Sequence, residues 1–566
     1  MKRVLVFGTF DRIHQGHIDF LKQAKRHGDY LIVVVARDKT VERLKRRPSS
    51  KKERERLKNI QKLKLVDEAR IGYKTNPYKI IEELKPDIIC LGYDQKVFTK
   101  DLPKELRKAG LKTKTYRMKA FQPRKYHSSL INKFMLDIKF IRQNPEKIKD
   151  ACKKKGIDLD IDRFLEVDKK RREYLQALED MRAQKNKANK EIQKTKSKEE
   201  KETIILKMRE LDTNSDRITK DFQGVDQEFQ RLILLIPNIP SEDSPVGPDD
   251  KSNKEIGKWG KIPKFNFKIK DHIQLGKDLN LIDAEAGAKS SGFRGYYLKN
   301  EAVLIHFGVL MYAVNKLKQK GFELFLPPTL MREFALIGSG HFPFGRDEVY
   351  QIGNPGKIET GENLKEPIFL AGTAEPSLLA YYTDKILNEE DLPVKMCGIS
   401  QCYRSEIGSY GKDTRGLYRV HEFMKVEQVV ICRANLKESD EWLDEMLKTS
   451  QEILKDLALP YRVVANSTGD MGAGKYKMYD IETWMPSRNA YGETHSDSNL
   501  TDWQTRRLNI RYRDKSGGIK FAYALNNTVI ASPRILIAIL ENYQKKDGSI
   551  EVPKVLQKYV GFKEIK

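Results

Sequence analysis

The sequence of 566 residues predicts a multidomain α/β protein. Three observations support this prediction. Apolar strands alternate with helical segments over residues 1–134, apolar residues recur at helical spacing over residues 163–235, and residues 400–427 read as two strands around a loop rich in Gly, Ser and charge. We therefore expect a doubly wound parallel α/β domain, an antiparallel coiled-coil hairpin and a third part that contains an antiparallel strand pair.

The first unit begins with a buried-type strand, RVLVFGTF, followed by a loop and the helical segment HIDFLKQAKRHG. YLIVVVARD then reads as a second apolar strand of the kind found in parallel sheets. Further expected elements are helices near residues 50–64 and 77–85 and short strands at 68–72, 87–92 and 112–118. This alternation of strand and helix predicts the doubly wound sheet.

The segment GTFDRIHQGH, residues 8–17, joins the first strand to the first helix. Gly8 ends the strand where the backbone is expected to approach a ligand closely. His14 and His17 lie three residues apart at a helix start, so they share one face. A helix N-terminus favours phosphate, and two imidazoles there can stabilise phosphate charge in a transition state.

Over nearly its whole length this unit resembles the nucleotidyltransferases of the cytidylyltransferase-like superfamily. ARDKTV, KKERERLKNIQKLKLVDEA and LGYDQ are most similar to archaeal-type FAD synthases, which transfer AMP from ATP to FMN; glycerol-phosphate cytidylyltransferases share the opening motif. The resemblance implies phosphate contacts from Lys45 and Arg56, and a nucleotide site lined by Gly8, Thr9, Phe10, His14, His17, Ser128 and Ser129. The alternative is a non-catalytic basic appendage that adds RNA affinity.

Residues 163–235 read as two long helices, with the turn in KTKSKEEK at residues 194–201. At 1.5 Å per residue each arm would be about 50 Å long. The hairpin by itself is equally typical of a packing or dimerising coiled coil. It ends at the Pro-rich linker IPNIPSEDSPVGPDD.

In residues 400–427, Arg404 and Glu406 are expected to face one side of the first strand. Phe423 and Glu427 are in phase on the second strand. A guanidinium suits a phosphate and an aromatic ring suits a base, so this surface fits a nucleotide. Alone, the pattern would equally fit an ordinary charged hairpin.

Residues 400–427 are similar to motif 2 of the seryl-tRNA synthetases, and the resemblance extends over residues 135–566. Residues 307–331 resemble motif 1 of the class II synthetases, a long helix and then a strand closing at Pro328. Residues 521–544 resemble motif 3, a strand that enters a helix near Arg534. The resemblance implies an antiparallel sheet flanked by helices, a homodimer, and a helical arm that binds tRNA(Ser) and, in many members, tRNA(Sec).

The same resemblance implies the site residues. Arg404 and Arg534 would be catalytic, and Mg²⁺ bound with ATP would be held by Glu493 and Ser496, which are hard oxygen donors. The implied L-serine site consists of Thr373, Ala374, Glu375, Glu427, Asn526 and Thr528. The implied ATP site consists of Arg404, Ser405, Glu406, Val420, Phe423, Glu493, Thr494, His495, Ser496 and Arg534.

The expected domains are residues 1–134, 135–240 and 241–566. The net charge of +26 is concentrated in the first, where 35 Lys and Arg stand against 15 Asp and Glu, a net charge of +20. This favours phosphate-rich partners, although solubility alone could explain it. Five Cys without a C-x-x-C pattern argue against disulfides, and no apolar run approaches the roughly 18 residues of a membrane helix. We expect a cytoplasmic protein.

Overall fold

The computed structural model describes residues 2–10, 15–45, 52–63, 65–73, 78–92, 102–118, 137–194, 197–354, 356, 366–407 and 416–566. The chain divides into two compact units, Met1–Asn132 and Lys133–Lys566. Each unit is described by itself.

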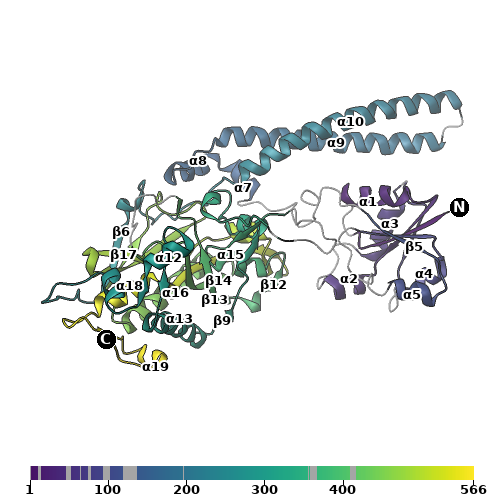
Figure 1. Ribbon diagram of the computed structural model, residues 1–566. Coiled ribbons are helices and arrows are strands. Elements are labelled where there is room, and N and C mark those ends of the chain that lie inside the picture. The colour runs from purple at the N-terminus through teal and green to yellow at the C-terminus, as the bar shows by residue number, and fades with distance from the viewer. Residues whose placement is uncertain are drawn as a thin grey trace. The chain divides into compact units, whose positions relative to one another are not determined.

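The first unit contains a parallel sheet (Figure 1). Its described strands are β1 (Arg3–Gly8), β2 (Tyr30–Val35), β3 (Glu68–Ile71), β4 (Ile88–Leu91) and β5 (Lys114–Arg117). They lie in the order β3-β2-β1-β4-β5, and every neighbouring pair is parallel. The later strands therefore lie on both sides of β1, with β2 and β3 on one side and β4 and β5 on the other. The carboxyl ends of β1 and β4 meet where the strand order reverses. In doubly wound sheets ligands bind at such a point.

Helices cover both faces of this sheet because both faces are apolar. They are α1 (Gln15–Lys25), α2 (Asp38–Lys45), α3 (Glu53–Gln61), α4 (Lys79–Leu84) and α5 (Leu102–Lys108). Val4 and Val6 of β1 pack in a cluster with residues of α1 and α3, whereas Leu5 and Phe7 pack with residues of α4 and α5. The predicted doubly wound fold is confirmed, and α2 and α5 are helices that the sequence pattern did not predict.

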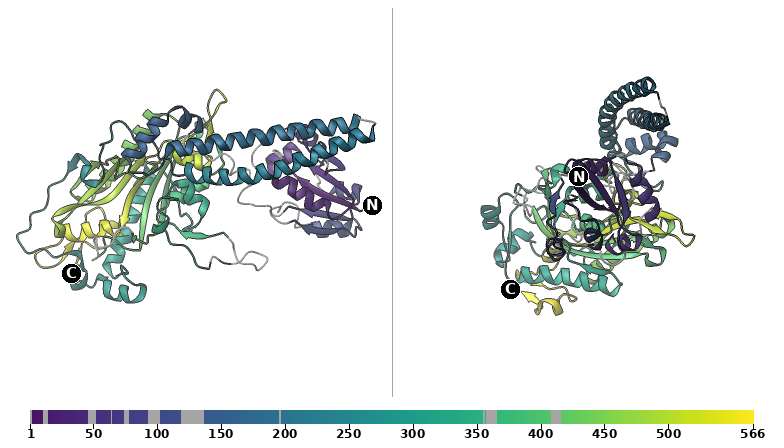
Figure 2. Two further views of the ribbon diagram at one scale, coloured as in Figure 1. Left: turned by 90° about the horizontal axis from the view of Figure 1, so that it is seen from above. Right: turned by 90° about the vertical axis from the view of Figure 1, so that its right-hand side faces the viewer.

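The second unit begins with helices α7 (Ile138–Gln143), α8 (Pro145–Lys154), α9 (Ile161–Lys194) and α10 (Lys198–Ile233). Figures 1 and 2 show α9 and α10 side by side as a long hairpin that rises from α7 and α8. A cluster that includes Ile148, Phe164 and Phe229 packs the base of the hairpin. The predicted helical hairpin is confirmed, and its helices extend further into residues 194–201 than we expected.

The rest of the second unit is built on a mostly antiparallel sheet in the order β6-β15-β16-β17-β20-β14-β13-β9, in which only the β13–β9 pair is parallel among the described strands. The strands are β6 (Lys254–Trp259), β9 (Glu323–Phe325), β13 (Val394–Tyr403), β14 (Glu422–Cys432), β15 (Tyr461–Ala465), β16 (Lys477–Met485), β17 (Ala490–Asn499) and β20 (Tyr523–Ser532).

Three helices, α13 (Glu301–Gln319), α16 (Leu436–Asp456) and α18 (Arg534–Asn542), contribute with this sheet to one large apolar cluster. The expected antiparallel sheet with flanking helices is confirmed. The smaller elements are α11 (His272–Asp278), β7 (Ile282–Asp283), α12 (Ala284–Ser291), β8 (Tyr297–Leu298), β10 (Leu330–Arg332), α14 (Glu333–Ser339), β11 (Ile368–Leu370), α15 (Glu375–Tyr381), β12 (Ile386–Asn388), α17 (Trp503–Leu508), β18 (Arg511–Arg513), β19 (Ile519–Phe521), β21 (Ile550–Glu551), α19 (Gln557–Val560) and β22 (Glu564–Ile565).

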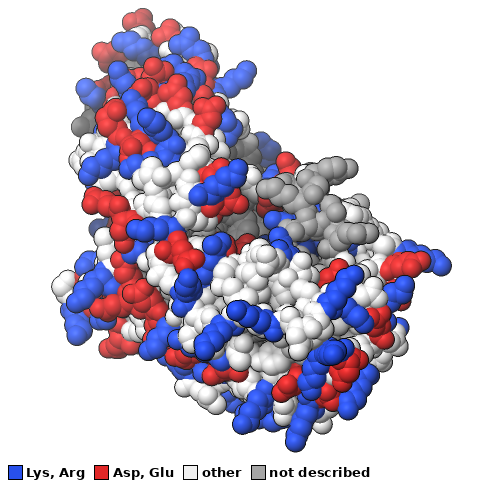
Figure 3. All heavy atoms as spheres, turned by 90° about the vertical axis from the view of Figure 1, so that its left-hand side faces the viewer, with Lys and Arg blue, Asp and Glu red and all other residues white. Residues whose placement is uncertain are grey.

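Charge is spread unevenly along the chain, and the 432 residues after residue 134 carry a net charge of only +6. On the face in Figure 3, Lys and Arg side chains are interspersed with Asp and Glu rather than gathered in a patch of one sign. Among the helices that the structure describes, none is both long enough and apolar enough to cross a membrane.

Candidate functional site

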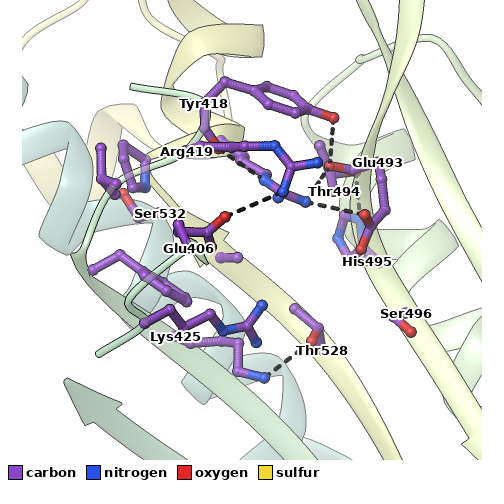
Figure 4. Close-up of a pocket in the computed structure, with 16 residues that line it drawn as sticks. Glu406, Tyr418, Arg419, Lys425, Glu493, Thr494, His495, Ser496, Thr528 and Ser532 are labelled. Carbon is purple, nitrogen blue, oxygen red and sulfur yellow. Dashed lines mark hydrogen bonds and ion pairs between the residues drawn. The ribbon is translucent and has the colours of Figure 1, made fainter. Parts of the chain in front are cut away.

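A cleft of about 500 Å³, open to solvent, lies over strands β14, β17 and β20 of the large sheet (Figure 4). Its walls combine guanidinium groups, carboxylates and aromatic rings. Guanidinium groups can bind phosphates and aromatic rings can stack on a base, so the walls suit a nucleoside triphosphate. The lining residues are Arg404, Glu406, Tyr418, Arg419, Val420, Phe423, Lys425, Glu493, Thr494, His495, Ser496, Thr528, Ala531, Ser532, Pro533 and Arg534.

Arg404 and Phe423 lie together in the cleft. The guanidinium carbon of Arg404 is 5.4 Å from the centroid of the Phe423 ring, and its Nε donates to the Gly372 carbonyl oxygen at 3.3 Å. β13 ends at Tyr403, so our placement of Arg404 and Glu406 on one face of a strand was wrong. The backbone of Arg404 is instead fixed just after the strand, because its N–H donates to the carbonyl oxygen of His421 at 2.9 Å.

Glu406 is held by two arginines. Its Oε2 lies 3.2 Å from Nη1 of Arg419 and 3.7 Å from Nη1 of Arg294. The residue has a positive φ of 54°, a backbone conformation that costs a non-glycine residue energy and often marks a functional position. Ser405, between Arg404 and Glu406, turns away from the cleft and donates its hydroxyl to the Asp347 carbonyl oxygen at 2.7 Å.

Arg534 is the first residue of α18, so its side chain adds to a helix N-terminus that already favours anions. Its Nε donates to the Tyr418 carbonyl oxygen at 3.1 Å, and its Nη1 lies 3.3 Å from the Glu493 carboxylate. Burial alone would lower the pKa of Arg534, but the Glu493 charge raises it above its usual value. In Figure 4, Glu406 and Glu493 lie on either side of Arg419.

The residues expected to hold Mg²⁺ present oxygen atoms to the cleft. Glu493 and Ser496 both line it, and Asp480 of β16 lies behind them with its Oδ1 buried and without a hydrogen-bond partner among described residues. Burial, followed by the charge of Glu493, raises the pKa of Asp480 well above its ordinary value. No group of three or more His, Cys, Asp or Glu in the described chain could hold a metal by itself. The donor set fits a Mg²⁺ that also binds phosphate oxygens.

Thr494 and His495, predicted for the same ATP site, line the cleft but face each other. The Thr494 Oγ1 lies 2.8 Å from Nδ1 of His495. Burial lowers the pKa of His495 to about 3, so its ring is neutral near pH 7. Val420 also lines the cleft, and it is buried.

Beside the cleft lies a smaller group of buried polar residues. Glu375 is the first residue of α15, and its Oε1 accepts from Asn526 Nδ2 at 2.7 Å. Thr373 precedes it, and the Thr373 hydroxyl accepts from the Glu375 N–H at 3.4 Å. The methyl group of Ala374 fits against Gly398, where an added Cβ would lie 2.7 Å away.

Glu427 is also buried, and Thr528, the remaining residue predicted for the serine site, contacts it. Thr528 Oγ1 donates to Glu427 Oε2 at 3.3 Å, and Lys425 Nζ donates to Thr528 Oγ1 at 3.2 Å. Lys425 and Glu427 form an ion pair. Burial raises the pKa of Glu427 above its usual value, against the opposing effect of Lys425. Thr528 thus connects the small polar group to the cleft that it helps to line.

In the first unit four of the predicted nucleotide residues are described, and Gly8, Thr9 and Phe10 lie at the carboxyl end of β1 with His17 beside them. Phe10 is buried with a φ of 50°, and its ring centroid lies 5.3 Å from that of His17. A Cβ at Gly8 would lie 2.5 Å from the Phe10 ring, so Gly8 makes room for Phe10. His14, Ser128 and Ser129 lie outside the described residues, as does the side chain of Lys45.

Arg56 does not present its charge as we expected of a phosphate contact. It is 0% exposed, and its guanidinium donates to the carbonyl oxygens of Thr9 at 2.5 Å and Ala36 at 2.7 Å and forms an ion pair with Asp38 at 2.7 Å. With these bonds Arg56 stabilises the backbone at Thr9, just after β1, from the protein interior.

Known proteins resemble each part of the chain. Three family models match: the class II tRNA synthetase core domain (G, H, P, S and T) over residues 357–543, the seryl-tRNA synthetase N-terminal domain over 135–240, and a cytidylyltransferase-like domain over 5–134. The serine–tRNA ligase of Deinococcus radiodurans is 42% identical over 76% of this chain and 99% of its own length. That of Rubrobacter xylanophilus is 40% identical over 75% and 98%.

The chain belongs to the seryl-tRNA synthetase family. Two solved structures agree with this membership. The seryl-tRNA synthetase of Pyrococcus horikoshii, complexed with ATP, has a TM-score of 0.68 and 37% identity, and covers 76% of this chain and 99% of its own. The cytoplasmic enzyme of Naegleria fowleri, in complex with AMP, has a TM-score of 0.66 and 30% identity over 77% and 98%. Both synthetase family models match within residues 135–543, and the cytidylyltransferase-like model matches before them.

Sequence reasoning missed several residues of the family's cleft. Arg419 and Tyr418 lie just before β14, where Arg419 holds Glu406 and the Tyr418 ring lies 4.6 Å from the Arg534 guanidinium carbon. Tyr418 and Arg419 could have been identified from the sequence, because they lie in the same segment, residues 400–427, as Arg404. Gln504, which contacts Glu375, had none, because it lies 129 residues away on another element.

Proposed function

We propose that residues 135–566 act as a serine–tRNA ligase, with residues 135–240 as the tRNA-binding domain and 241–566 as the catalytic domain. The arrangement that carries the proposal is the cleft that combines Arg404, Phe423 and Arg534 beside the buried carboxylate of Glu375. The substrates would be ATP, L-serine and tRNA(Ser), with tRNA(Sec) as a second candidate RNA. These substrates are used in the cytoplasm, where we expect the protein to act.

The proposed chemistry has two steps. An oxygen of the serine carboxylate attacks the α-phosphorus of ATP, which forms seryl-adenylate and releases pyrophosphate. A hydroxyl of the terminal ribose of tRNA then attacks the seryl carbonyl carbon, which releases AMP. No side chain needs to form a covalent intermediate, so the protein contributes positioning and charge stabilisation.

The ATP subsite follows from the cleft. Phe423 offers its ring to the adenine, and Arg404 beside it offers donors to the α-phosphate. Arg534, at the start of α18, would bind the terminal phosphate and the departing pyrophosphate. Phosphate oxygens would compete with Glu493 for Arg534, which leaves the Glu493 carboxylate and the Ser496 hydroxyl for Mg²⁺. The metal would neutralise phosphate charge when bound.

The serine subsite follows from the buried polar group. Glu375 is a carboxylate for the substrate ammonium, with Thr373 and Asn526 beside it. Thr528 and Glu427 are paired at 3.3 Å and can hydrogen-bond the serine hydroxyl. Alanine lacks the hydroxyl and could not make these hydrogen bonds, so the site should discriminate against it.

We also propose a homodimer. On α13 the side chains of Leu304, Phe307 and Met311 are 49%, 50% and 46% exposed and lie at helical spacing on one face. Three large apolar side chains exposed in a row are typical of an interface.

The decisive experiment is serine-dependent exchange of pyrophosphate into ATP with Arg404→Ala. We expect a loss of at least about 100-fold, as for the removal of one charged donor from a reacting centre. Arg433→Ala is a matched control, since Arg433 is exposed and pairs with Glu438 on the surface. Unchanged exchange in Arg404→Ala would contradict the assigned site.

For the first unit we propose a nucleotidyltransferase activity, with FMN adenylylation as the candidate reaction. The supporting observation is the loop of Gly8, Thr9 and Phe10, packed against His17 at the point where the strand order reverses. The test is pyrophosphate release by the full chain, without serine, from ATP or CTP supplied with FMN or glycerol 3-phosphate. We expect release with ATP and FMN and its loss in His17→Ala; no release with any pair would favour the RNA-binding appendage.

A further inference from the structure

Gln504 is a buried polar residue that no step above uses. It lies on α17 and is 1% exposed. Its Nε2 donates to Oε1 of Glu375 at 2.5 Å and to the Ser339 carbonyl oxygen at 2.8 Å. Its Oε1 has no hydrogen-bond partner among the described residues.

These two contacts fix which way the Gln504 amide points. An amide nitrogen carries two N–H groups, and both meet acceptors here. The reversed amide would place its oxygen against a carboxylate and a carbonyl, which are both acceptors. The observed orientation is therefore strongly preferred over its reverse.

The consequence falls on Glu375. Its Oε1 accepts from two side-chain amides, those of Gln504 and Asn526. Its Oε2 makes no hydrogen bond with a described residue. One carboxylate oxygen is thus fixed from two directions, and the other is left as an acceptor.

We propose that Gln504 is a positioning residue for amino-acid recognition, which holds the Glu375 carboxylate so that Oε2 faces the substrate ammonium. The inference rests on the serine–tRNA ligase function proposed above. Because two side-chain amides hold one carboxylate oxygen of Glu375, the other oxygen is available to accept from the ligand. The Gln504 contact to Ser339 also fixes the C-terminal end of α14 against the same group.

The test is the serine KM of the full chain in pyrophosphate exchange, measured with Gln504→Met. Methionine keeps the length and volume of the side chain and removes both donors. We expect the serine KM to rise about tenfold or more, while the ATP KM and kcat change by less than about twofold, because one hydrogen bond to a charged group is lost at the amino-acid subsite alone.

Thr505→Val is the matched control. Thr505 is the next residue of α17, equally buried, and its hydroxyl donates to the Ala522 carbonyl oxygen at 2.5 Å, away from Glu375. The loss of this hydrogen bond in Thr505→Val should lower the stability of the folded protein without raising the serine KM. A serine KM in Gln504→Met within about twofold of the wild type, or the same rise in Thr505→Val, would overturn the role of Gln504.

A second variant, Gln504→Glu, keeps the shape and tests the charge. It places a carboxyl group against Glu375, and two adjacent carboxyl groups can share one proton. We expect its serine KM to be high at pH 8 and to fall towards the wild-type value at pH 6. A pH-independent defect would contradict the proposal. A wild-type chain without any serine-dependent exchange would instead overturn the proposed function itself, and this inference with it.

Discussion

At the scale of single residues, the second unit contains carboxyl groups that are buried in different ways. Glu427 is paired with Lys425, and Glu375 accepts from two amides. Asp497 on β17 has neither kind of partner, since both of its carboxylate oxygens are buried without a hydrogen bond among the described residues. Burial, followed by the charge of Asp444, raises the pKa of Asp497 well above its ordinary value.

The substitution Asp497→Asn should therefore stabilise the protein at neutral pH. Because the pKa of Asp497 is higher in the folded than in the unfolded chain, stability is lost as pH rises from the unfolded value towards the folded one. Asparagine does not ionise, so the unfolding midpoint of the variant should exceed that of the wild type by about 2 °C or more at pH 8, and by less at pH 5.

Differential scanning calorimetry at the two pH values is the measurement for Asp497→Asn. Asp221→Asn, on the exposed surface of α10, is its control and should show no such pH-dependent gap. A midpoint that falls in Asp497→Asn at pH 8 would mean that the carboxylate has a partner that the fold requires.

At the scale of elements, the apolar pattern of a segment decided whether it could be predicted from the sequence. β1, β2, α9 and α10 have long apolar patterns and were predicted, whereas α2 and α5 are short and rich in charge. The chemistry of the segment around Arg404 was readable, but its backbone was not. β13 ends at Tyr403, and the backbone N–H of Arg404 bonds to the carbonyl oxygen of His421, a partner that no local pattern identifies.

The loop after β1 gives a test at this scale. In Gly8→Ala the new methyl group would lie 2.5 Å from the Phe10 ring, so the ring and its contact with His17 must move. Overpacking of this kind costs about 1–3 kcal/mol. We expect the nucleotidyltransferase activity to fall at least tenfold, with serine-dependent exchange unchanged.

Gly72→Ala is the control for Gly8→Ala, because its methyl group would meet Val34 at 3.4 Å, an ordinary contact in the same unit. Pyrophosphate release with ATP and FMN measures the first activity. Equal activity of Gly8→Ala and the wild type would show that the packing of Phe10 does not matter for the reaction.

The end of α8 is fixed to the catalytic part by Lys155. Its buried Nζ donates to the carbonyl oxygens of Gly472, Ala473 and Lys475 at 3.2, 3.0 and 2.5 Å. Burial nevertheless lowers the pKa of Lys155 to about 7. Since this pKa is depressed in the folded chain, the stability that Lys155 contributes is present at high pH and is lost as pH falls through about 7.

We therefore expect a pH-dependent difference between the wild type and Lys155→Met. The unfolding midpoint of the wild type should gain on that of the variant between pH 7 and pH 10, measured by circular dichroism at 222 nm. Lys153→Met, at an exposed position of α8, should track the wild type throughout. A constant difference between wild type and Lys155→Met would show that Lys155 does not titrate in this range.

At the scale of the whole molecule, the chain consists of two compact units that differ in charge and in chemistry. Every residue that lines the cleft, and every residue predicted for the serine site, lies within Lys133–Lys566. The three motifs of the family and the apolar patterns of β1 and β2 could be predicted from the sequence. The contacts that organise the site could not, because Gln504, Glu375 and Asn526 come from three separate elements and meet only in the folded chain.

The last prediction concerns the removal of residues 1–134, which carry a net charge of +20. If the first unit is an enzyme and not an RNA-binding appendage, the remaining chain should keep its kcat/KM for serine and ATP within about twofold. The dependence of tRNA binding on salt should also stay the same, because the slope of log affinity against log salt counts the phosphates that a protein neutralises. Filter binding of tRNA(Ser) at 50–200 mM salt measures this slope. A truncated chain whose slope is smaller by several units would show that the basic unit contacts RNA, and would favour the appendage over the nucleotidyltransferase.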